Sequence, residues 1–192
     1  MRKLKLQVQI SVDGFIAGPN GEMDWLIWNW DDALMTYVKE LTEPVETILL
    51  GRKLAEGFIG AWQSRAENPE TADAGAHKMN DSHKIVFSST LERIEGKNVT
   101  LSQGDLVAEV TALKVQTGGD LIAYGGAEFV SSLIKNNLVD DYHLFVNPVA
   151  LGSGMPIFSN LENRLNLELV KSQAFACGIV VQNYKPATAN EG

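Results

Sequence analysis

Glycine, basic and hydroxyl side chains follow three apolar segments of the sequence, in the stretches GRK (51–53), SST (88–90) and GG (125–126). A glycine lets a backbone approach a ligand closely and permits positive φ. An arginine can bind a phosphate with two parallel hydrogen bonds, and hydroxyls can donate to a ribose phosphate. A helix beginning directly after the glycines would add free N–H groups and a positive dipole end. The three stretches together favour a site for a phosphate-bearing ligand.

Each stretch also has an ordinary structural interpretation, which stays open on these residues alone. A GG pair at a strand–helix turn is more often turn chemistry, and this pair lacks the GxGxxG spacing of a dinucleotide fingerprint. The three hydroxyl residues could cap a turn or a helix. Arg52 and Lys53 could be solvated, but basic residues at a helix start oppose the helix dipole. That opposition favours a ligand or a charge partner at this position.

The segments that must position these stretches alternate between strand-like and helix-like patterns. Strands are predicted at 3–11, 46–51, 84–88, 98–103, 120–125 and 140–149, with a final hairpin in 165–186 that turns near Cys177–Gly178. Helices are predicted at 31–41, from about 52, at 105–117 and at 127–137, while 12–30 is a long loop and 62–81 a polar excursion with some helix. This order predicts an α/β fold with a mostly parallel sheet and an antiparallel edge. Ligands of such sheets bind outside the carboxyl ends of the strands, where the three stretches should lie.

Composition and charge limit the classes of protein that the chain can represent. Its 192 residues are 45% hydrophobic and 21% charged, which suits one domain over residues 1–192. No apolar run approaches the roughly 18–20 residues of a membrane span. The net charge of −8 argues against a nucleic-acid partner but not against a small anion. A single cysteine, Cys177, excludes an intramolecular disulfide and fits a reducing compartment, so a cytoplasmic location is expected.

The aromatic, histidine and cysteine residues give weaker signals. Trp25, Trp28 and Trp30 precede the first predicted helix, and they could line a planar substrate or form a local core or an oligomer contact. The three histidines are scattered without metal-ligand spacing, so no metal is expected. Cys177 has no visible activating partner and is taken as incidental.

Acidic residues near the N-terminus favour structural roles. Asp13 is expected to fix the turn at Gly14 by hydrogen-bonding the backbone. Asp31 and Asp32 stand at the start of the first predicted helix, where capping is preferred over proton donation. The GSG stretch at 152–154 either lets a backbone approach a ligand or turns the chain. No catalytic residue is assigned.

Several motifs in order resemble the RibD C-terminal, dihydrofolate-reductase-like family. They are SVDGFIAG (11–18), LLGRK (49–53), VFSSTL (86–91), the long stretch from YGGAEF to GSGMPIF (124–158) and the final hairpin. The resemblance covers residues 3–184. It implies a three-layer dihydrofolate-reductase-like fold, NADPH as cofactor and a homodimer. It also implies reduction of a small planar heterocycle, pterin- or pyrimidine-like, as in 5-amino-6-(5-phosphoribosylamino)uracil reductase domains.

The same resemblance implies a set of cofactor residues. Arg52 would meet the adenosine 2′-phosphate, the amides of Lys53 and Leu54 would face the pyrophosphate with Gly125 and Gly126, and Ile16 and Ala17 would lie near the nicotinamide. The ribose side would be lined by Ser88, Ser89 and Thr90, and the cofactor set also includes Gly51, Ala127 and Glu128. The substrate-side candidates are Asp13, Trp25 and Asp32.

The chain also departs from the family pattern. Leu54 stands where dihydrofolate reductases usually have threonine, and NGEMDWL (20–26) replaces their LPW loop. One cysteine cannot build the zinc-deaminase motif of the bifunctional relatives. Besides the reductase, two hypotheses stay open: a non-catalytic nucleotide-binding or regulatory module that keeps the fold, and a structural role with a degenerate cofactor site.

Overall fold

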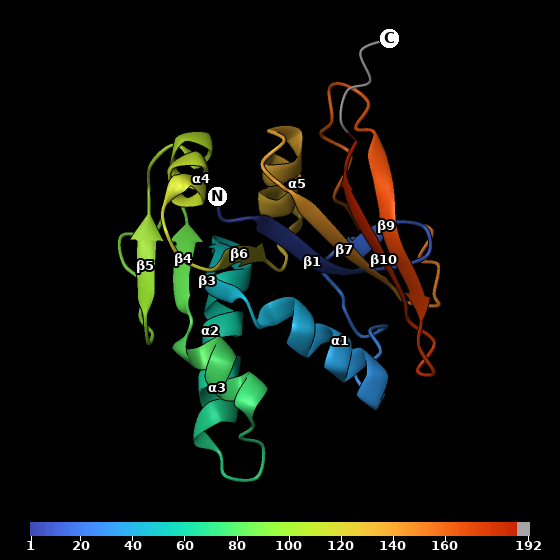
Figure 1. The fold of residues 1–192 in the computed structure, drawn as a ribbon, viewed down its shortest axis with the longest axis horizontal. Coiled ribbons are helices and arrows are strands. Elements are labelled where there is room, and N and C mark those ends of the chain that lie inside the picture. Colours follow the sequence, from blue (N-terminus) through green and yellow to red (C-terminus); the bar gives the residue numbers. More distant parts are fainter. Residues whose placement is uncertain (188–192) are drawn as a thin grey trace.

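One sheet of eight strands runs through the computed structural model, which describes residues 1–187 (Figure 1). The last five residues of the predicted domain lie outside the described ones. The strand order is β5-β4-β3-β6-β1-β7-β10-β9, which runs from left to right in Figure 1. The first six strands of that order are parallel to their neighbours, and β10 and β9 are antiparallel. This is the predicted α/β sheet with an antiparallel C-terminal edge.

The strand bounds agree closely with the apolar segments of the sequence. The parallel strands are β1 (Leu4–Ile10), β3 (Val45–Gly51), β4 (His83–Phe87), β5 (Val99–Ser102), β6 (Asp120–Ala123) and β7 (Asp141–Val146). The final hairpin consists of β9 (Leu167–Ala174) and β10 (Val180–Pro186). Ladder pairing sets Leu49 beside Ala123 and Gly51 beside Phe87. The carboxyl ends of β3, β4 and β6 therefore meet at one edge of the sheet.

Helices cover both faces of the sheet and give the three layers. Apolar residues of α1 (Asp32–Thr42), α2 (Arg52–Glu67) and α3 (Ala74–Asp81) join one core cluster, together with Ile48 and Leu50. Those of α4 (Leu106–Val115) and α5 (Ala127–Lys135) join the other, together with Leu4 and Leu6. Because helices pack on both faces, even the polar residues Lys5 and Gln7 of the alternating strand β1 are buried.

The helices start in two different ways. Three of them follow an aspartate whose carboxylate accepts the N–H three residues further on: Asp31 for α1, Asp73 for α3 and Asp105 for α4. Such caps satisfy one of the four N–H groups that a helix start leaves without a partner. The other two, α2 and α5, begin after Gly51 and Gly126 without a side-chain cap.

Two short strands were not predicted from the sequence, and the first of them falls within the predicted loop 12–30. β2 (Phe15–Ala17) pairs antiparallel with β8 (Met155–Pro156) in a separate two-stranded sheet. Strands of two and three residues are too short to show a period. Their pairing depends on close packing, since a Cβ added to Gly154 would lie 2.4 Å from the Ala17 carbonyl oxygen. The polar stretch 62–81 is also more helical than expected, because α2 continues to Glu67 and α3 follows.

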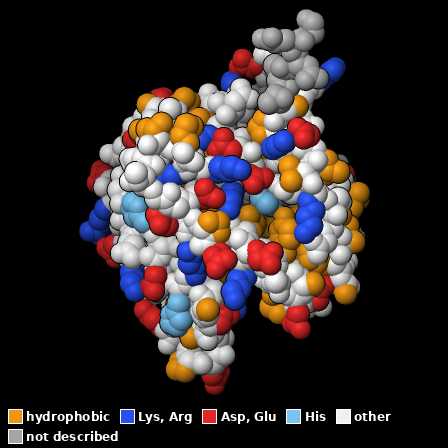
Figure 2. Space-filling view, in the orientation of Figure 1, with side chains coloured by type: hydrophobic (Ala, Val, Ile, Leu, Met, Phe, Trp, Pro, Cys, Tyr) orange, Lys and Arg blue, Asp and Glu red, His pale blue; other side chains and the backbone are white. Residues whose placement is uncertain are grey.

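The surface charges and the lengths of the helices limit the kinds of partner and environment that suit the protein. Acidic and basic side chains are interspersed over the face shown in Figure 2, among smaller apolar areas. In the part of the chain that the structure describes, no helix has both the length and the apolar character needed to cross a membrane.

Candidate functional site

The starts of α2 and α5 lie against each other at the carboxyl edge of the sheet. Each follows one of two paired parallel strands, β3 and β6. A Cβ on Gly51 would lie 2.6 Å from Phe129 Cβ, and one on Gly125 would lie 3.4 Å from Leu54 Cδ2. The predicted GRK and GG stretches are therefore brought together, as sequence reasoning expected of strand ends.

Both helix starts keep N–H groups available for an anion. Gly51 and Gly126 carry no side-chain oxygen, and neither start has a side-chain cap hydrogen bond. Gly126 has φ of +82°, a conformation that favours glycine. Free first-turn N–H groups and the positive dipole ends of two helices in contact are well suited to a phosphate or pyrophosphate. The glycine pair thus serves the turn at Gly126 and leaves an open approach at Gly125.

The basic residues of the GRK stretch differ in their partners. Arg52 is exposed and makes no ion pair within residues 1–187. Lys53 Nζ lies 3.0 Å from Glu128 Oε1, so the first turns of α2 and α5 are joined by a salt bridge. We expected a ligand or a charge partner for the basic start of α2, and Glu128 is the charge partner of Lys53. Sequence reasoning placed both residues at the site but did not pair them.

The SST stretch follows β4 at the same edge. Ser88 comes directly after Phe87, the ladder partner of Gly51. Ser88 Oγ accepts the N–H groups of Thr90 at 3.2 Å and Leu91 at 3.0 Å, so it closes a local turn. Ser89 and Thr90 are exposed. The structural interpretation, in which a hydroxyl closes a turn, therefore holds for Ser88. The hydroxyls of Ser89 and Thr90 stay accessible beside the site.

Residues 11–17, which follow β1 along the chain, lie at the same edge of the sheet. Ile16 Cδ1 lies 3.8 Å from the position of a Cβ on Gly125, and Ala17 is buried in the β2–β8 pair. Of the two nicotinamide-side residues implied by the family resemblance, Ile16 thus adjoins the glycine pair, and Ala17 contacts Gly154 instead.

Asp13 anchors this segment by contacts that differ from the predicted ones. Its carboxylate accepts Ser11 Oγ at 2.6 Å, Gly152 N at 2.7 Å and Leu151 N at 3.1 Å. These hydrogen bonds, that of Ser11 first, lower the pKa of Asp13 to about 2. The turn at Gly14 is instead closed by its N–H donating to the Ser11 carbonyl. Asp13 therefore ties the start of β2 to the GSG loop, and it is ionised at neutral pH.

Asn147 is a positioning residue that the sequence analysis missed. It is fully buried just after β7, its Oδ1 accepts the N–H of Ile27 at 3.0 Å, and its Nδ2 donates to Gln9 Oε1 at 2.9 Å. It thereby fixes the tryptophan-containing loop to the ends of β1 and β7. The only signal in the sequence is a polar residue directly after an apolar strand.

The three tryptophans of that loop have different environments. Trp30 packs on Phe145 with ring centroids 6.2 Å apart, so it belongs to the local core. Trp28 stacks on Trp30 at 6.4 Å and is 68% exposed. Trp25 is half-buried and donates its indole N–H to the Glu22 carbonyl. An accessible aromatic surface for a substrate or a partner is therefore offered mainly by Trp28.

The first-helix carboxylates do not resemble proton donors. Asp31 accepts the N–H of Leu34 through one oxygen and that of Cys177 through the other, both at 2.9 Å. These hydrogen bonds hold the pKa of Asp31 below its ordinary value of 3.8. The preference for capping is thus confirmed at Asp31. Asp32 is an exposed residue in the first turn of α1.

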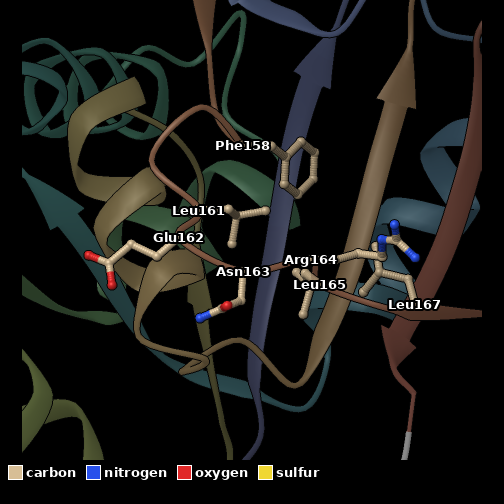
Figure 3. Close-up of a pocket in the computed structure, with 7 residues that line it drawn as sticks. All are labelled: Phe158, Leu161, Glu162, Asn163, Arg164, Leu165 and Leu167. Atoms are coloured by element: carbon tan, nitrogen blue, oxygen red, sulfur yellow. The ribbon is translucent and has the colours of Figure 1, made fainter.

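Two cavities of the described chain lie away from the strand-end site. One, of about 500 Å³, is lined by residues of the segment 158–167 that follows β8 (Figure 3). In this segment Glu162 pairs with Lys135 at the far end of α5. The other, of about 640 Å³, is lined by Arg65 and residues 70–73. Within residues 1–187 no group of three or more His, Cys, Asp or Glu side chains could hold a metal ion.

This fold and this edge define a class of protein. Residues 2–181 match the RibD C-terminal domain, so the chain belongs to that family. It is 33% identical over 179 residues to the uncharacterized protein YyaP of Bacillus subtilis (strain 168), covering 93% of this chain and 92% of YyaP.

Two solved structures show the same fold at low sequence identity. The deaminase/5-amino-6-(5-phosphoribosylamino)uracil reductase of Thermotoga maritima aligns with a TM-score of 0.68 and 16% identity, over 97% of this chain and 57% of that one. Dihydrofolate reductase of Enterococcus faecalis, complexed with NADP(H) and RAB-propyl, aligns with a TM-score of 0.63 and 19% identity, over 97% of both chains. The dihydrofolate-reductase-like fold is thereby established.

Proposed function

We propose that the protein is an NADPH-dependent reductase of a small planar heterocycle, pterin- or pyrimidine-like. The observation that carries this proposal is the contact between two glycine-capped helix starts at the carboxyl edge of the sheet. Membership of a family that includes reductases supports it, as does the fold shared with a dihydrofolate reductase complexed with NADP(H). When bound, NADPH supplies the hydride for the reduction.

The residues at this edge suit the parts of NADPH. Arg52, exposed and without a carboxylate partner within residues 1–187, would bind the 2′-phosphate. The first-turn N–H groups of α2 and α5, at Lys53–Leu54 and after Gly125–Gly126, would bind the pyrophosphate. The accessible hydroxyls of Ser89 and Thr90 would lie on the ribose side, and Ile16 and Ala17 on the nicotinamide side.

On the substrate side, the protein offers two anchored loops that can shape a binding site, and no general acid is identified there among residues 1–187. The loop before α1 is held by Asn147 and the start of β2 by Asp13, so both can form one wall of a substrate site. Trp25 and Trp28 could stack on a planar ring there. Asp13 and Asp31 have lowered pKa values and are ionised at neutral pH, so neither serves as a general acid.

A second function, a nucleotide-binding or regulatory module without turnover, is favoured by one observation. Asp13 and Asp31, the carboxylates that anchor the two loops beside the proposed site, both have pKa values lowered by hydrogen bonds. A general acid working near neutral pH needs the opposite shift. This hypothesis expects NADPH to bind without oxidation in the presence of pterins or pyrimidines.

The proposed reductase would act as a homodimer on a small-molecule substrate. Within residues 1–187 the terminal strand β9 has a ladder partner on one side only, and its Leu169 and Val170 are 53% and 55% exposed. An exposed edge of this kind is a ready surface for a second copy. Sedimentation equilibrium should give twice the monomer mass, and a Val170→Lys variant should move it toward the monomer. A monomeric wild type would contradict this part of the proposal.

Titration with NADPH and NADH, followed by intrinsic tryptophan fluorescence, tests the cofactor assignment. We expect selective quenching by NADPH. Arg52→Ala should weaken NADPH about 10–100-fold and leave NADH nearly unchanged, since hydrogen bonds to a charged group contribute about 1.5–3 kcal/mol. Arg65→Ala, at the other end of the same helix, is the matched control and should change neither affinity. Equal loss for both nucleotides in Arg52→Ala would place the 2′-phosphate elsewhere.

A further inference from the structure

Lys53 and Glu128 form an ion pair across the mouth of the proposed nucleotide site. Lys53 is the second residue of α2 and Glu128 the second residue of α5, and their charged atoms are 3.0 Å apart. The pair therefore spans the two helix starts whose N–H groups are free. Any anion bound to those N–H groups would lie beside both side chains.

From this geometry, and on the basis of the proposed function, we propose that Glu128 is a specificity-determining residue. It holds Lys53 until a diphosphate takes its place, and it lowers the affinity of the site for every anion. Only a ligand that also reaches Arg52 recovers the lost affinity. Glu128 thus selects a phosphorylated dinucleotide over free phosphate.

The helix dipoles explain why the two residues pair in the absence of a ligand. A lysine in the first turn of α2 is opposed by the positive dipole end, while a glutamate in the first turn of α5 is favoured by it. Glu128 therefore supplies the negative charge that the neighbouring helix start lacks. Its negative charge lies near the two helix starts, where the negative charge of a bound phosphate would lie.

Exposure makes the exchange of partners easy. The side chains of Lys53 and Glu128 are 65% and 83% exposed, and ion pairs that open to solvent contribute little to stability. A phosphate offers Lys53 a charge-assisted hydrogen bond of at least equal strength. The carboxylate can turn into solvent without disturbing the fold, but its charge stays close to the bound anion.

The adjacent basic residues Arg52 and Lys53 therefore differ in how readily they can bind an anion. Arg52 has no carboxylate partner within residues 1–187 and is available at once, whereas Lys53 must first leave Glu128. Inorganic phosphate bound to the helix-start N–H groups meets the repulsion of Glu128 and carries no second phosphate group for Arg52. A nucleotide with a separate phosphate on its ribose can compensate through Arg52.

The test compares Glu128→Gln with wild type, using NADPH and inorganic phosphate as the probes. We expect NADPH to bind about threefold to tenfold more tightly to Glu128→Gln, which corresponds to one unit charge removed near the surface. Inorganic phosphate should become an effective competitor of NADPH only in this variant. Both gains should shrink between 50 and 500 mM NaCl because the charges are screened.

Two further variants identify the cause. Lys53→Met should weaken NADPH binding. Glu128→Gln should strengthen NADPH binding less in the Lys53→Met background than in wild type, because one part of the effect of Glu128 is that it holds Lys53. Glu162→Gln breaks the Lys135–Glu162 pair at the other end of α5 and should leave NADPH affinity unchanged. Unchanged melting temperatures for all variants would show that each is folded.

The outcomes separate this inference from the proposed function. If wild type binds NADPH and Glu128→Gln binds it equally or more weakly, the inference is wrong while the cofactor assignment stands. If neither wild type nor Glu128→Gln binds NADPH, both are wrong. Binding by Glu128→Gln alone would support both and show how strongly the carboxylate opposes the ligand.

Discussion

The helices of this protein start in two contrasting ways, and the contrast coincides with the division between structure and proposed function. At α1, α3 and α4 an aspartate accepts the N–H three residues further on. At α2 and α5 a glycine precedes the helix and no side chain caps it. A helix start that is not capped by its own sequence is free to bind something else.

The charges do not follow this division but set α2 apart from the other described helix starts, because α5 carries Glu128 in its first turn and the first turn of α3 has no acidic residue. The first turns of α1 and α4 carry acidic residues, Asp32 and Glu109, which the helix dipole favours. The first turn of α2 has no acidic residue and instead opens with Arg52 and Lys53. A start of this kind costs stability, by about 0.3–1 kcal/mol for each charge. Glu128 offsets part of this cost at Lys53, and the proposed anionic ligand would offset the cost at Arg52.

The largest expected effect comes from separating the two glycine-capped starts. In Gly51→Ala the new Cβ would lie 2.6 Å from Phe129 Cβ, so α5 must move away from α2. We expect a loss of about 1–3 kcal/mol in the free energy of unfolding, the usual cost of overpacking. Urea denaturation measures this loss, and NADPH affinity should fall with it.

Gly57→Ala provides the control, because Gly57 lies within the same helix and a Cβ there meets no atom within 4 Å. This variant should gain about 0.5–1 kcal/mol from helix propensity and keep its NADPH affinity. Equal stability of Gly51→Ala and Gly57→Ala would mean that the two helix starts are not in the close contact described.

The two residues of the GG pair should respond differently, which sharpens the comparison. Gly126→Ala must hold an alanine at φ of +82°, so we expect a loss of about 1–2 kcal/mol in unfolding free energy. Gly125→Ala places its Cβ at an ordinary 3.4 Å from Leu54 Cδ2, so its stability should change by less than about 0.5 kcal/mol. Its NADPH affinity should nevertheless fall, because the methyl group occupies the approach to the helix starts. Unchanged NADPH affinity in Gly125→Ala would mean that Gly125 and Gly126 serve only the turn between β6 and α5.

The smallest effect concerns a capped start and its dependence on pH. The ionised Asp31 carboxylate accepts N–H groups of Leu34 and Cys177, and its pKa is lowered from 3.8. Its stabilisation is therefore present above about pH 4 and is lost as the pH falls through the lower folded-state pKa. Asp31→Ala should lower the melting temperature at pH 7 by a few degrees. The difference from wild type should narrow toward pH 2, and NADPH affinity at pH 7 should stay the same; a constant difference across this range would exclude the capping role.

Short-range patterns were enough to predict most of the fold and the place of the site. β3 and β6 are short apolar runs bounded by turn residues, and α5 has an apolar face, so their types and approximate bounds were readable. Parallel strands bring their carboxyl ends to one edge, which put Gly51 and Gly125 near each other before any coordinates.

Contacts between distant segments were not readable. β2 and β8 are too short to show a period, and they form because Gly154 allows close approach to Ala17. Asp13 bonds to Gly152, 139 residues away, although a local turn was the nearer interpretation. The buried amide of Asn147 reaches Ile27 across 120 residues and gives no pattern along the chain.

The sequence by itself determined which segments are strands and helices, that the sheet is mostly parallel, and that glycine, basic and hydroxyl residues end three of its strands. These features are local, since they depend on the spacing of apolar residues and on the backbone preferences of glycine and aspartate. Only the tertiary structure decided that Lys53 meets Glu128, that Ser88 closes its own turn while Arg52 has no carboxylate partner within residues 1–187, and that Asp13 ties two loops together. Such pairings depend on side-chain distances of a few ångströms between elements, and these distances are set by how the layers pack rather than by any order along the chain.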